Sequence, residues 1–344
     1  MPITIIGYLA GNQGFNDGQS VKTRTLCCAL SKLGITINSI DTYYVKRKPL
    51  GFLWRLGSSL FCSRKYIVLV SSNGRKFLFP ILYVFAKIFK KQIYHDVIGG
   101  RLADEVQSAP YMKRFLNAFC GNWVESRLLE KQLRELGVTN ATYVPNFKLI
   151  SPLSSSELPA KPNMPLRFCT FSRVVQEKGI SDAIEALAQL NGEKIVATLD
   201  IYGSIAMEYQ QEFETLCSRY QHFCTYVGVI DADKSIATLK NYDMLLFPTY
   251  WPGEGMPGTI IDALCAGLPV LARHWTYCDE MITHLKTGLV YDSDKPEKLT
   301  DWLNYAVTHP QEVYAMKSAC LSAGAAYTAQ AVVPQIVALL QGGK

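Results

Sequence analysis

Short apolar runs alternate with stretches of helical periodicity along almost the whole chain of 344 residues. In the first half the predicted strands are 3–9, 35–40, 66–72, 92–97 and 121–126, and the predicted helices are 20–34, 76–90, 108–118 and 126–136; residues 141–147 end this half. In the second half the predicted strands are 166–172, 195–202, 224–229, 243–248 and 269–272, and the predicted helices are 178–190, 207–219, 232–240 and 258–266. Two such alternating series predict an α/β fold with two Rossmann-like domains that face each other across a cleft.

A change of composition separates the two series. Residues 151–165, SPLSSSELPAKPNMP, are rich in Ser and Pro and lack a periodic apolar pattern, so we expect them to form a linker. The N-terminal domain is then 1–150 and the C-terminal domain is 166–325. The last stretch, 326–344, has a helical pattern, and we expect it to cross back to the N-terminal domain.

The composition indicates a folded protein with reduced thiols. Hydrophobic residues make up 49% of the chain and charged residues 19%, which excludes a disordered protein. The ten cysteines show no disulfide or zinc framework, which favours a cytoplasmic protein. The first ten residues lack a basic segment and are expected to form a strand, not a signal peptide. The longest apolar run, 77–89, is too short to span a bilayer.

Positive charge is concentrated in the first half. Residues 1–150 carry 21 Lys and Arg against 8 Asp and Glu, a net charge of +13, whereas residues 151–344 carry a net charge of −7. Basic and aromatic residues mix in 42–65, and basic residues from Arg75 to Lys91 flank the helix 76–90. One interpretation is a core helix with solvated basic ends. Another is an anionic membrane surface that Trp54 and Phe52 enter. We expect no nucleic acid, because no RNP-like or helix-turn-helix pattern accompanies the charges.

A glycine-rich loop, GNQGFNDG, follows the first predicted strand, and Ser20 is expected to cap the helix after it. Gly11 and Gly14 belong to a G-x-x-G-x-x-x-G spacing, which differs from the dinucleotide fingerprint G-x-G-x-x-G. Asp41 closes the second strand, where a dinucleotide-binding fold often has an acid. A dinucleotide site is therefore the less favoured interpretation of this loop.

Two loops of the C-terminal half have residues suited to a phosphorylated sugar. Arg173 and Lys178 lie on one loop after a strand, where two cations can clamp a pyrophosphate, unless Glu177 neutralises Lys178 in a solvated loop. Glu254 lies in a loop rich in Gly and Pro before the helix that carries Asp262. The N-terminus of that helix favours phosphate or polarised hydroxyls. The alternative is that Glu254 is a surface acid and Asp262 part of a polar helix face.

A histidine in the first half is a further candidate. His95 ends a predicted strand just before Gly99 and Gly100, at the edge of a parallel sheet where ligands bind. A lone histidine is often structural, so both interpretations stay open.

The segments SRVVQEKGI (172–180) and FPTYWPGEGMPGTIIDALCAGLPV (247–270) resemble the retaining nucleotide-sugar glycosyltransferases of family GT4, which have the GT-B fold. The resemblance covers the layout of essentially the whole chain. The family's E-x7-E element corresponds to Glu254 and Asp262, so its second acid is shortened. Gly255-Met256-Pro257 corresponds to the family's Gly-Phe-Gly, and Pro257 has no N–H to donate.

The resemblance implies roles for these residues. Arg173 and Lys178 would hold the donor diphosphate and stabilise the leaving nucleotide. Glu254 would hold sugar hydroxyls, Asp262 would hold the ribose, and His95 would lie at the reaction centre. The donor site implied by the match consists of Gly11, Gly14, Arg173, Lys178, Glu254, Gly255, Met256, Pro257, Gly258, Thr259 and Asp262. Glu280 would support this site.

The resemblance also implies a reaction with retention, without a required metal or other cofactor. Asp231 and Asp233 resemble a D-x-D metal element, but we expect cations such as Arg173 and Lys178 to replace the ion. No strong pair of nucleophile and base is visible, so we expect a front-face attack without a covalent intermediate.

The function that these features predict is transfer of a sugar, a hexose, from a nucleotide diphosphate, with UDP expected, to a polysaccharide or lipid-linked glycan of the bacterial surface. The partners are then the donor, the glycan acceptor and an anionic membrane surface, and the enzyme would work in the cytoplasm at the inner face of the membrane. A sugar-nucleotide epimerase or a phosphorylase of the same fold is the alternative within enzymes. A non-catalytic binding subunit is the third hypothesis, although it would be expected to have lost Arg173, Lys178 or Glu254.

Overall fold

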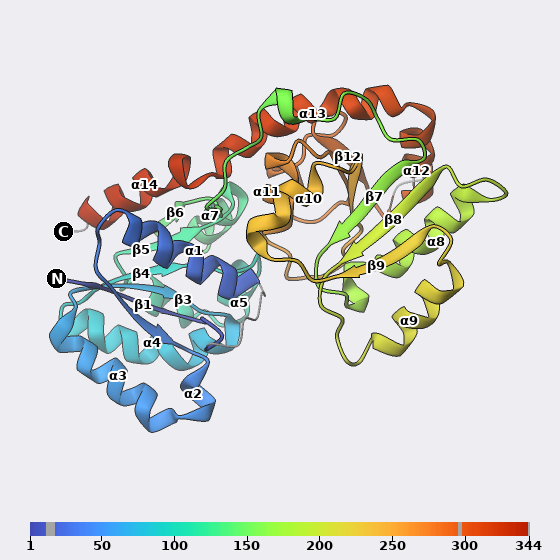
Figure 1. Cartoon of the computed structure of the whole chain (residues 1–344). Coiled ribbons are helices and arrows are strands. Elements are labelled where there is room, and N and C mark those ends of the chain that lie inside the picture. Colours follow the sequence, from blue (N-terminus) through green and yellow to red (C-terminus); the bar gives the residue numbers. More distant parts are fainter. Residues whose placement is uncertain (12–17, 295–297, 343–344) are drawn as a thin grey trace. The chain divides into compact units, whose positions relative to one another are not determined.

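The computed structural model describes residues 1–11, 18–294 and 298–342, and these form two compact units. Unit 1 comprises Met1–Leu149, Gly255–Pro257 and Ala329–Lys344, and unit 2 comprises Ile150–Glu254 and Gly258–Thr328. Each unit contains a parallel six-stranded sheet with helices on both faces (Figure 1). The predicted α/β fold with two Rossmann-like parts is therefore confirmed.

The sheet of unit 1 has the strand order β2-β1-β3-β4-β5-β6. Its strands are β1 (Ile3–Gly7), β2 (Ile37–Asp41), β3 (Lys65–Leu69), β4 (Gln92–Asp96), β5 (Gly121–Val124) and β6 (Ala141–Tyr143). Its helices are α1 (Gly18–Lys32), α2 (Tyr44–Arg47), α3 (Pro49–Cys62), α4 (Ser72–Lys87), α5 (Leu102–Ser108), α6 (Met112–Leu116), α7 (Arg127–Glu135) and α14 (Ala329–Gly342). The central strands are apolar along most of their length because helices bury both faces of a parallel sheet.

The C-terminal helix α14 completes the core of unit 1. Val332, Val333, Ile336 and Leu340 repeat at helical spacing and pack into the same apolar cluster as β1, β3 and α1. Lys65 at the start of β3 donates to the Leu340 carbonyl (2.5 Å) and thereby fixes the end of this helix.

The sheet of unit 2 has the strand order β12-β11-β10-β7-β8-β9. Its strands are β7 (Leu166–Phe171), β8 (Ala197–Tyr202), β9 (Cys224–Gly228), β10 (Met244–Phe247), β11 (Val270–Arg273) and β12 (Gly288–Tyr291). Its helices are α8 (Ile180–Asn191), α9 (Gln210–Arg219), α10 (Ser235–Leu239), α11 (Gly258–Cys265), α12 (Leu299–Thr308) and α13 (Pro310–Gly324). Phe168, Leu199 and Ile201 pack into one apolar cluster, because alternate residues of a strand point to the same face of the sheet.

Each sheet has one place where the strand order reverses. In unit 1 the chain turns back between β1 and β3, and in unit 2 it turns back between β7 and β10. The connections on the two sides of such a point leave in opposite directions, so a crevice opens at the carboxyl ends of the two strands. In unit 2 the loops after β7 and β10 are those that carry Arg173, Lys178 and Glu254.

Several local predictions differ from the structure. Ser20 lies buried inside α1 and does not cap it. The single helix predicted at 108–118 is replaced by α5 and α6, because Pro110 interrupts the helical pattern. Residues 42–65 contain two helices, α2 and α3, and β12 was not predicted.

The segment between the two sheets is fixed in unit 2. Residues 151–165 contain one turn of 3-10 helix, Ser155–Glu157, in which Glu157 caps the Ser154 backbone. Farther on, Asn163 bonds both carboxylate oxygens of Asp243 beside the start of β10. A Ser- and Pro-rich composition therefore does not make this segment a free tether.

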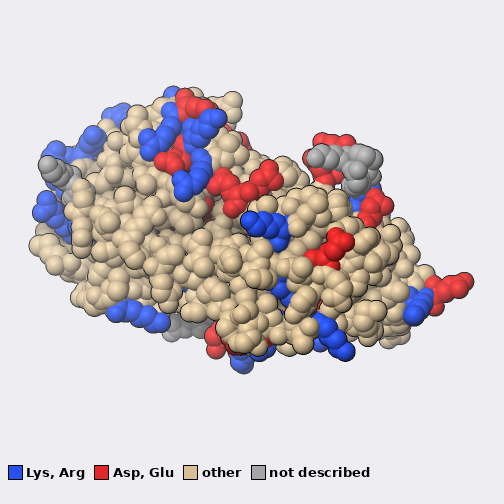
Figure 2. All heavy atoms as spheres, turned by 90° about the horizontal axis from the view of Figure 1, so that it is seen from above, with Lys and Arg blue, Asp and Glu red and all other residues tan. Residues whose placement is uncertain are grey.

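Charged side chains cover only part of the surface. Figure 2 shows one face of the molecule, on which Lys, Arg, Asp and Glu form separate patches between larger areas of other residues.

No helix of the described residues combines the length and apolar character that a membrane span requires.

Candidate active site

The switch point of unit 2 brings together the loops that follow β7 and β10. The Tyr250 N–H donates to the Glu177 carbonyl (2.9 Å), and the Thr249 hydroxyl donates to the same carbonyl (3.2 Å). These two bonds hold the loops side by side, as expected for parallel strands whose carboxyl ends meet at one edge.

Lys178 and Glu254 form an ion pair between these loops. Lys178 Nζ lies 2.5 Å from Glu254 Oε2, and the two side chains are 14% and 11% exposed. The Thr249 hydroxyl donates to the same carboxylate oxygen (3.1 Å), and the centre of the Phe247 ring lies 5.4 Å from the ammonium. The structure thus brings together two residues that are 76 positions apart in the sequence.

A glycine makes this approach of the loops possible. Gly179 caps α8 with a φ of +65°, and an added Cβ would lie 2.4 Å from the Pro248 carbonyl oxygen. Residues with a side chain rarely adopt this conformation, and no space exists for one here. Lys178 therefore ends a turn of 3-10 helix, Gln176–Lys178, and does not open α8 as the sequence suggested.

Arg173 is the exposed cation on the same loop. Its guanidinium has no ion pair with a described residue, unlike Lys178, whose charge Glu254 already neutralises. A phosphate group would gain a complete partner at Arg173 and would have to compete for Lys178.

The helix α11 begins four residues after Glu254. The hydroxyl of Thr259 in its first turn is buried without a hydrogen-bond partner among the described atoms. Asp262, one turn farther along, is 3% exposed within the helix. Its predicted contact with a ribose therefore stays a proposal, and the same holds for the contacts of Gly258 and Thr259.

Gly255, Met256 and Pro257 group with unit 1. Met256 is buried there, and Asn146 Nδ2 donates to its carbonyl (3.0 Å). The Met256 N–H donates to the Glu125 carboxylate, where it helps to lower the pKa against the effect of burial. The Met256 N–H thus has a partner in this structure, and the implied place of Met256 in the donor site stays a proposal.

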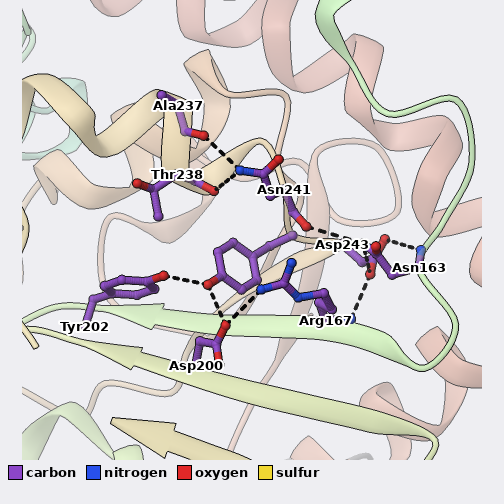
Figure 3. Close-up of polar contacts among 9 residues, drawn as sticks. Asn163, Arg167, Asp200, Tyr202, Ala237, Thr238, Asn241 and Asp243 are labelled. Atoms are coloured by element: carbon purple, nitrogen blue, oxygen red, sulfur yellow. Dashed lines mark hydrogen bonds and ion pairs between the residues drawn. The ribbon is translucent and has the colours of Figure 1, made fainter. Parts of the chain in front are cut away.

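A polar network fixes the other ends of the two switch-point strands. Figure 3 shows Asp243 bonding to Asn163 and to the Arg167 N–H, while the Arg167 guanidinium reaches Asp200 (3.0 Å). Asp200 also accepts from the Tyr242 hydroxyl (2.7 Å), and burial raises the pKa of Tyr242 far above its ordinary value. The network locks β7 to β10 at their amino ends, so the loops at their carboxyl ends start from fixed positions.

Unit 1 contains a buried charge cluster that sequence analysis missed. Lys22 on α1 lies 2.6 Å from Asp96 at the end of β4 and 2.7 Å from Glu125 just after β5, and it also donates to the Val97 carbonyl. All three side chains are buried. No local pattern could reveal it, because Lys22 and Glu125 are 103 positions apart.

The cluster has two acids for one cation. Burial lowers the pKa of Lys22, but the two carboxylates outweigh it and raise the pKa above its usual value. Burial raises the pKa of Asp96 and of Glu125, and Lys22 offsets only part of that increase. The cluster fastens α1 to the carboxyl ends of two strands, with an excess of negative charge.

The prediction that His95 lies at the reaction centre needs correction. His95 is 0% exposed, and its ring packs edge-on against Phe79 with 4.9 Å between the ring centres. Its Nδ1 lies 3.3 Å from the side-chain oxygen of Asn122. Burial, with a contribution from the Arg75 charge, holds the pKa of His95 well below its ordinary value. His95 points to the opposite face of β4 from Asp96, and a neutral ring enclosed by α4 cannot contact a substrate.

The glycine-rich loop is described only up to Gly11, and Gly14 lies outside the described residues. Gly11 has a φ of +59°, and its N–H donates to Asp41 (2.8 Å), which also accepts from the Leu9 N–H (2.9 Å). Asp41 therefore fixes the start of the loop, and its carboxylate is used by the backbone.

Other candidates have structural partners. Asp231 pairs with Lys234 (3.1 Å) on the surface, and Glu280 accepts a bond at its backbone carbonyl from the Tyr327 hydroxyl. Within the described ranges no group of three His, Cys, Asp or Glu side chains forms a possible metal site. Whether the reaction needs a metal stays a prediction.

Comparison with known proteins agrees with this geometry. Residues 155–319 match the family described as Glycosyl transferases group 1. The structure resembles that of HepE from Anabaena in complex with UDP and glucose, with a TM-score of 0.73 and 15% identity over 99% of this chain and 100% of HepE. At this identity the likeness concerns the fold alone.

Two sequence relatives are glycosyltransferases by name. The uncharacterized glycosyltransferase MJ1069 of Methanocaldococcus jannaschii is 25% identical over 39% of this chain and 34% of its own length. WcaL of Salmonella typhimurium, named as a putative colanic acid biosynthesis glycosyltransferase, is 24% identical over 52% of this chain and 46% of its own length. The chain thus matches less than half of the length of either relative.

The two parallel sheets and the likeness to HepE define the fold of the chain as GT-B. The match to the glycosyl transferases group 1 family covers residues 155–319, just under half of the chain, and most of them lie in unit 2.

Proposed function

We propose that this chain is a retaining glycosyltransferase of family GT4 that transfers a sugar from a nucleotide diphosphate to a glycan acceptor. UDP is the nucleotide that we expect in the donor. The observation that carries the proposal is the contact of Lys178 with Glu254 at the switch point of unit 2, beside the exposed Arg173. A cation pair for a diphosphate and an acid for sugar hydroxyls are what a sugar nucleotide requires.

Binding of the donor would rearrange the ion pair. A diphosphate carries more charge than one carboxylate, so it would take Lys178 as a partner and complete its contacts with Arg173. Glu254, released from Lys178, would accept hydrogen bonds from hydroxyls of the transferred sugar. Lys178 is therefore neutralised at rest and becomes part of a phosphate clamp with Arg173 when the donor arrives.

The chemical step that we propose is the one that the resemblance to family GT4 implies. The bond between the anomeric carbon and the phosphate oxygen breaks, and the acceptor oxygen forms its bond to the same face of that carbon. The proton of the acceptor hydroxyl passes to the leaving phosphate oxygen, whose charge Arg173 and Lys178 stabilise. No enzyme-bound covalent intermediate is required.

We also propose that the acceptor is a polysaccharide or lipid-linked glycan of the bacterial surface, and that the enzyme works from the cytoplasm at the inner face of the membrane. The relationship to WcaL and the net charge of +13 on residues 1–150 support this assignment.

Nucleotide binding tests the proposal without knowledge of the acceptor. Unfolding would be followed with UDP, GDP and ADP, because a ligand of the folded state at a hundred times its Kd stabilises it by about 2.7 kcal/mol. We expect one diphosphate to raise the Tm, R173A to reduce that rise, and K194A, which removes an exposed cation elsewhere in unit 2, to leave it unchanged. An equal rise in R173A and the parent protein would contradict the diphosphate clamp.

Incubation with sugar nucleotide alone separates the proposed function from the epimerase alternative. A transferase releases nucleotide only slowly without acceptor, whereas an epimerase converts the donor to its epimer. Accumulation of an epimer would overturn the assignment.

A further inference from the structure

Helix α3 has apolar residues on both of its faces. Phe52, Leu56 and Ser59 are buried against the sheet and anchor the helix to unit 1. A surface helix normally has polar residues on its opposite face. Here that face carries an apolar stripe, which starts at Leu50 and continues three, four and eleven residues later. This stripe, which we call the α3 stripe, consists of Leu50, Leu53, Trp54 and Phe61.

The stripe is strongly exposed. The exposed fractions are 82% for Leu50, 74% for Trp54 and 89% for Phe61. Single exposed apolar residues need no explanation, but several that share one face of a helix indicate an interaction surface. The prediction that Phe52 enters a membrane together with Trp54 is corrected here, because Phe52 is one of the buried anchors (3% exposed).

A second exposed apolar segment lies beside the end of the stripe. Lys91 donates to the carbonyls of Leu60 (2.5 Å) and Ser63 (2.9 Å), which places the residues after α4 next to the C-terminal end of α3. Ile88 and Phe89, three and two positions before Lys91, are both exposed. Figure 1 shows α3 and α4 on the same side of the sheet of unit 1.

The charge around the stripe has one sign. No Asp or Glu occurs from residue 42 to residue 95, whereas 11 Lys and Arg do. Arg75 is not a solvated helix end as one interpretation expected, because it is buried and bonded to Glu105. The exposed cations are Lys46, Arg47, Lys48, Arg55, Arg64, Lys76, Lys87 and Lys90.

We infer that α3 lies in the plane of an anionic membrane surface, with the α3 stripe in the acyl boundary and the surrounding Lys and Arg at the headgroups. An apolar face with Trp, flanked by basic residues, is what an interfacial helix requires. The inference rests on the proposed function for its purpose, since a lipid-linked acceptor would lie in that membrane, but the binding is tested separately.

Two other occupants fit less well. A second copy that used the same surface would bring cations against cations across a two-fold axis, because the region has no acid to pair with them. A nucleic acid would explain the cations but not Leu50, Trp54 and Phe61, since exposed aliphatic side chains gain nothing from a phosphate backbone.

Vesicle flotation tests the apolar contribution. The protein would be mixed with vesicles of phosphatidylcholine alone and of phosphatidylcholine with phosphatidylglycerol. We expect flotation with the anionic vesicles, and a loss of at least about tenfold in partitioning for W54S/F61S, because two large side chains no longer leave water. The control L33S/M207S removes two exposed apolar residues elsewhere and should float like the parent protein.

A second pair of variants tests the charges. Each basic residue near an anionic surface contributes about fivefold to binding, so K46Q/K48Q should reduce partitioning by roughly 25-fold and added salt should reduce it further. The control K32Q/K194Q changes the net charge equally at exposed sites outside 42–95 and should leave partitioning nearly unchanged.

Equal flotation with neutral and anionic vesicles, or equal losses in W54S/F61S and its control, would overturn the inference. Binding to RNA in place of vesicles would overturn it in favour of a nucleic acid. The rise in Tm that a nucleotide causes separates the two proposals. If W54S/F61S keeps this rise but no longer floats with vesicles, the variant has lost only the membrane contact. If the parent protein shows no rise in Tm with any nucleotide, that result contradicts the proposed donor site and not the membrane contact.

Discussion

Lys178 and Glu254 stabilise each other in the absence of substrate. Both side chains are largely shielded from water, and an unpaired charge in such a place is costly. The pair also explains why the alternative partner expected for Lys178, Glu177, is not used: the Glu177 carbonyl, not its carboxylate, connects the two loops.

His95 gives a prediction at the scale of a single residue. Its pKa is lowered in the folded protein, so the neutral ring contributes stability that is present above the unfolded-state pKa of about 6.5 and is lost as pH falls below it. We expect the free energy of unfolding of the parent protein, measured with denaturant, to fall relative to H95Q by up to about 1.4 kcal/mol per pH unit below pH 6.5.

The comparison with H95Q is necessary because other groups act in the opposite direction. Asp96 and Glu125 have raised pKa values, so their contribution is lost as pH rises through the folded pKa and regained as pH falls. H222Q, which changes an exposed histidine, should keep the pH dependence of the parent protein. If H95Q also keeps the pH dependence of the parent protein, the buried neutral ring of His95 is not the source of that dependence.

At the scale of elements, the connection between β7 and α8 determines where Lys178 lies. Gly179 allows the loop to pass the Pro248 carbonyl, and the network of Asp243, Arg167 and Asp200 holds the strands that carry both loops. The phosphate-binding geometry therefore depends on residues that do not themselves contact a donor.

G179A tests this dependence. Gly34 has a φ of +77° with open space around it. G34A should therefore lower the free energy of unfolding by only about 1–2 kcal/mol, the cost of the left-handed conformation for a residue with a side chain. G179A should lower the free energy of unfolding by about 1–3 kcal/mol more than G34A does, because the new methyl group meets the Pro248 carbonyl. Denaturant unfolding measures both values, and the Tm rise with nucleotide should disappear in G179A alone.

A similar cost for G34A and G179A, with nucleotide binding intact in both, would show that the loops after β7 and β10 do not depend on this close approach.

The elements were predictable where the chain repeats one pattern. Apolar runs such as ITIIG and MLLF are short, buried and bounded by loops, and they appear as β1 and β10. Helix α3 was not predicted, because its apolar residues point both inward and outward and leave no polar face to define a helical period. An exposed apolar stripe hides the pattern by which surface helices are recognised.

The site was predictable only in part, for a similar reason. Arg173, Lys178 and Glu254 stand next to strands and glycines, so their loops could be located from the sequence. The direction of a side chain within a strand could not, and His95 points under α4 while Asp96 points to Lys22. A difference of one residue in a strand reverses the face.

At the scale of the whole molecule, chemistry and charge are divided between the two halves of the sequence. Residues 151–344 contain Arg173, Lys178 and Glu254 and carry a net charge of −7, whereas residues 1–150 contain the α3 stripe and carry a net charge of +13. A donor in solution and an acceptor at a membrane would thus be recognised by different parts of the chain.

Release of nucleotide from sugar nucleotide tests the central claim most directly. Chromatography of UDP-sugar incubated with the enzyme and a membrane-lipid extract as acceptor would measure UDP together with the transfer of labelled sugar to lipid. We expect transfer by the parent protein and a loss of at least about a hundredfold in E254A, because the interactions with the developing transition state are removed. The control E135A removes an exposed acid on α7 and should keep the parental rate.

E254A should remain folded because Glu254 lies in a loop outside both apolar clusters, although its Tm should fall because Lys178 loses its partner. Circular dichroism and the Tm verify this before the rates are compared. We expect transfer to require Glu254 in a folded protein, and a parental rate of turnover in folded E254A would overturn the role of this residue.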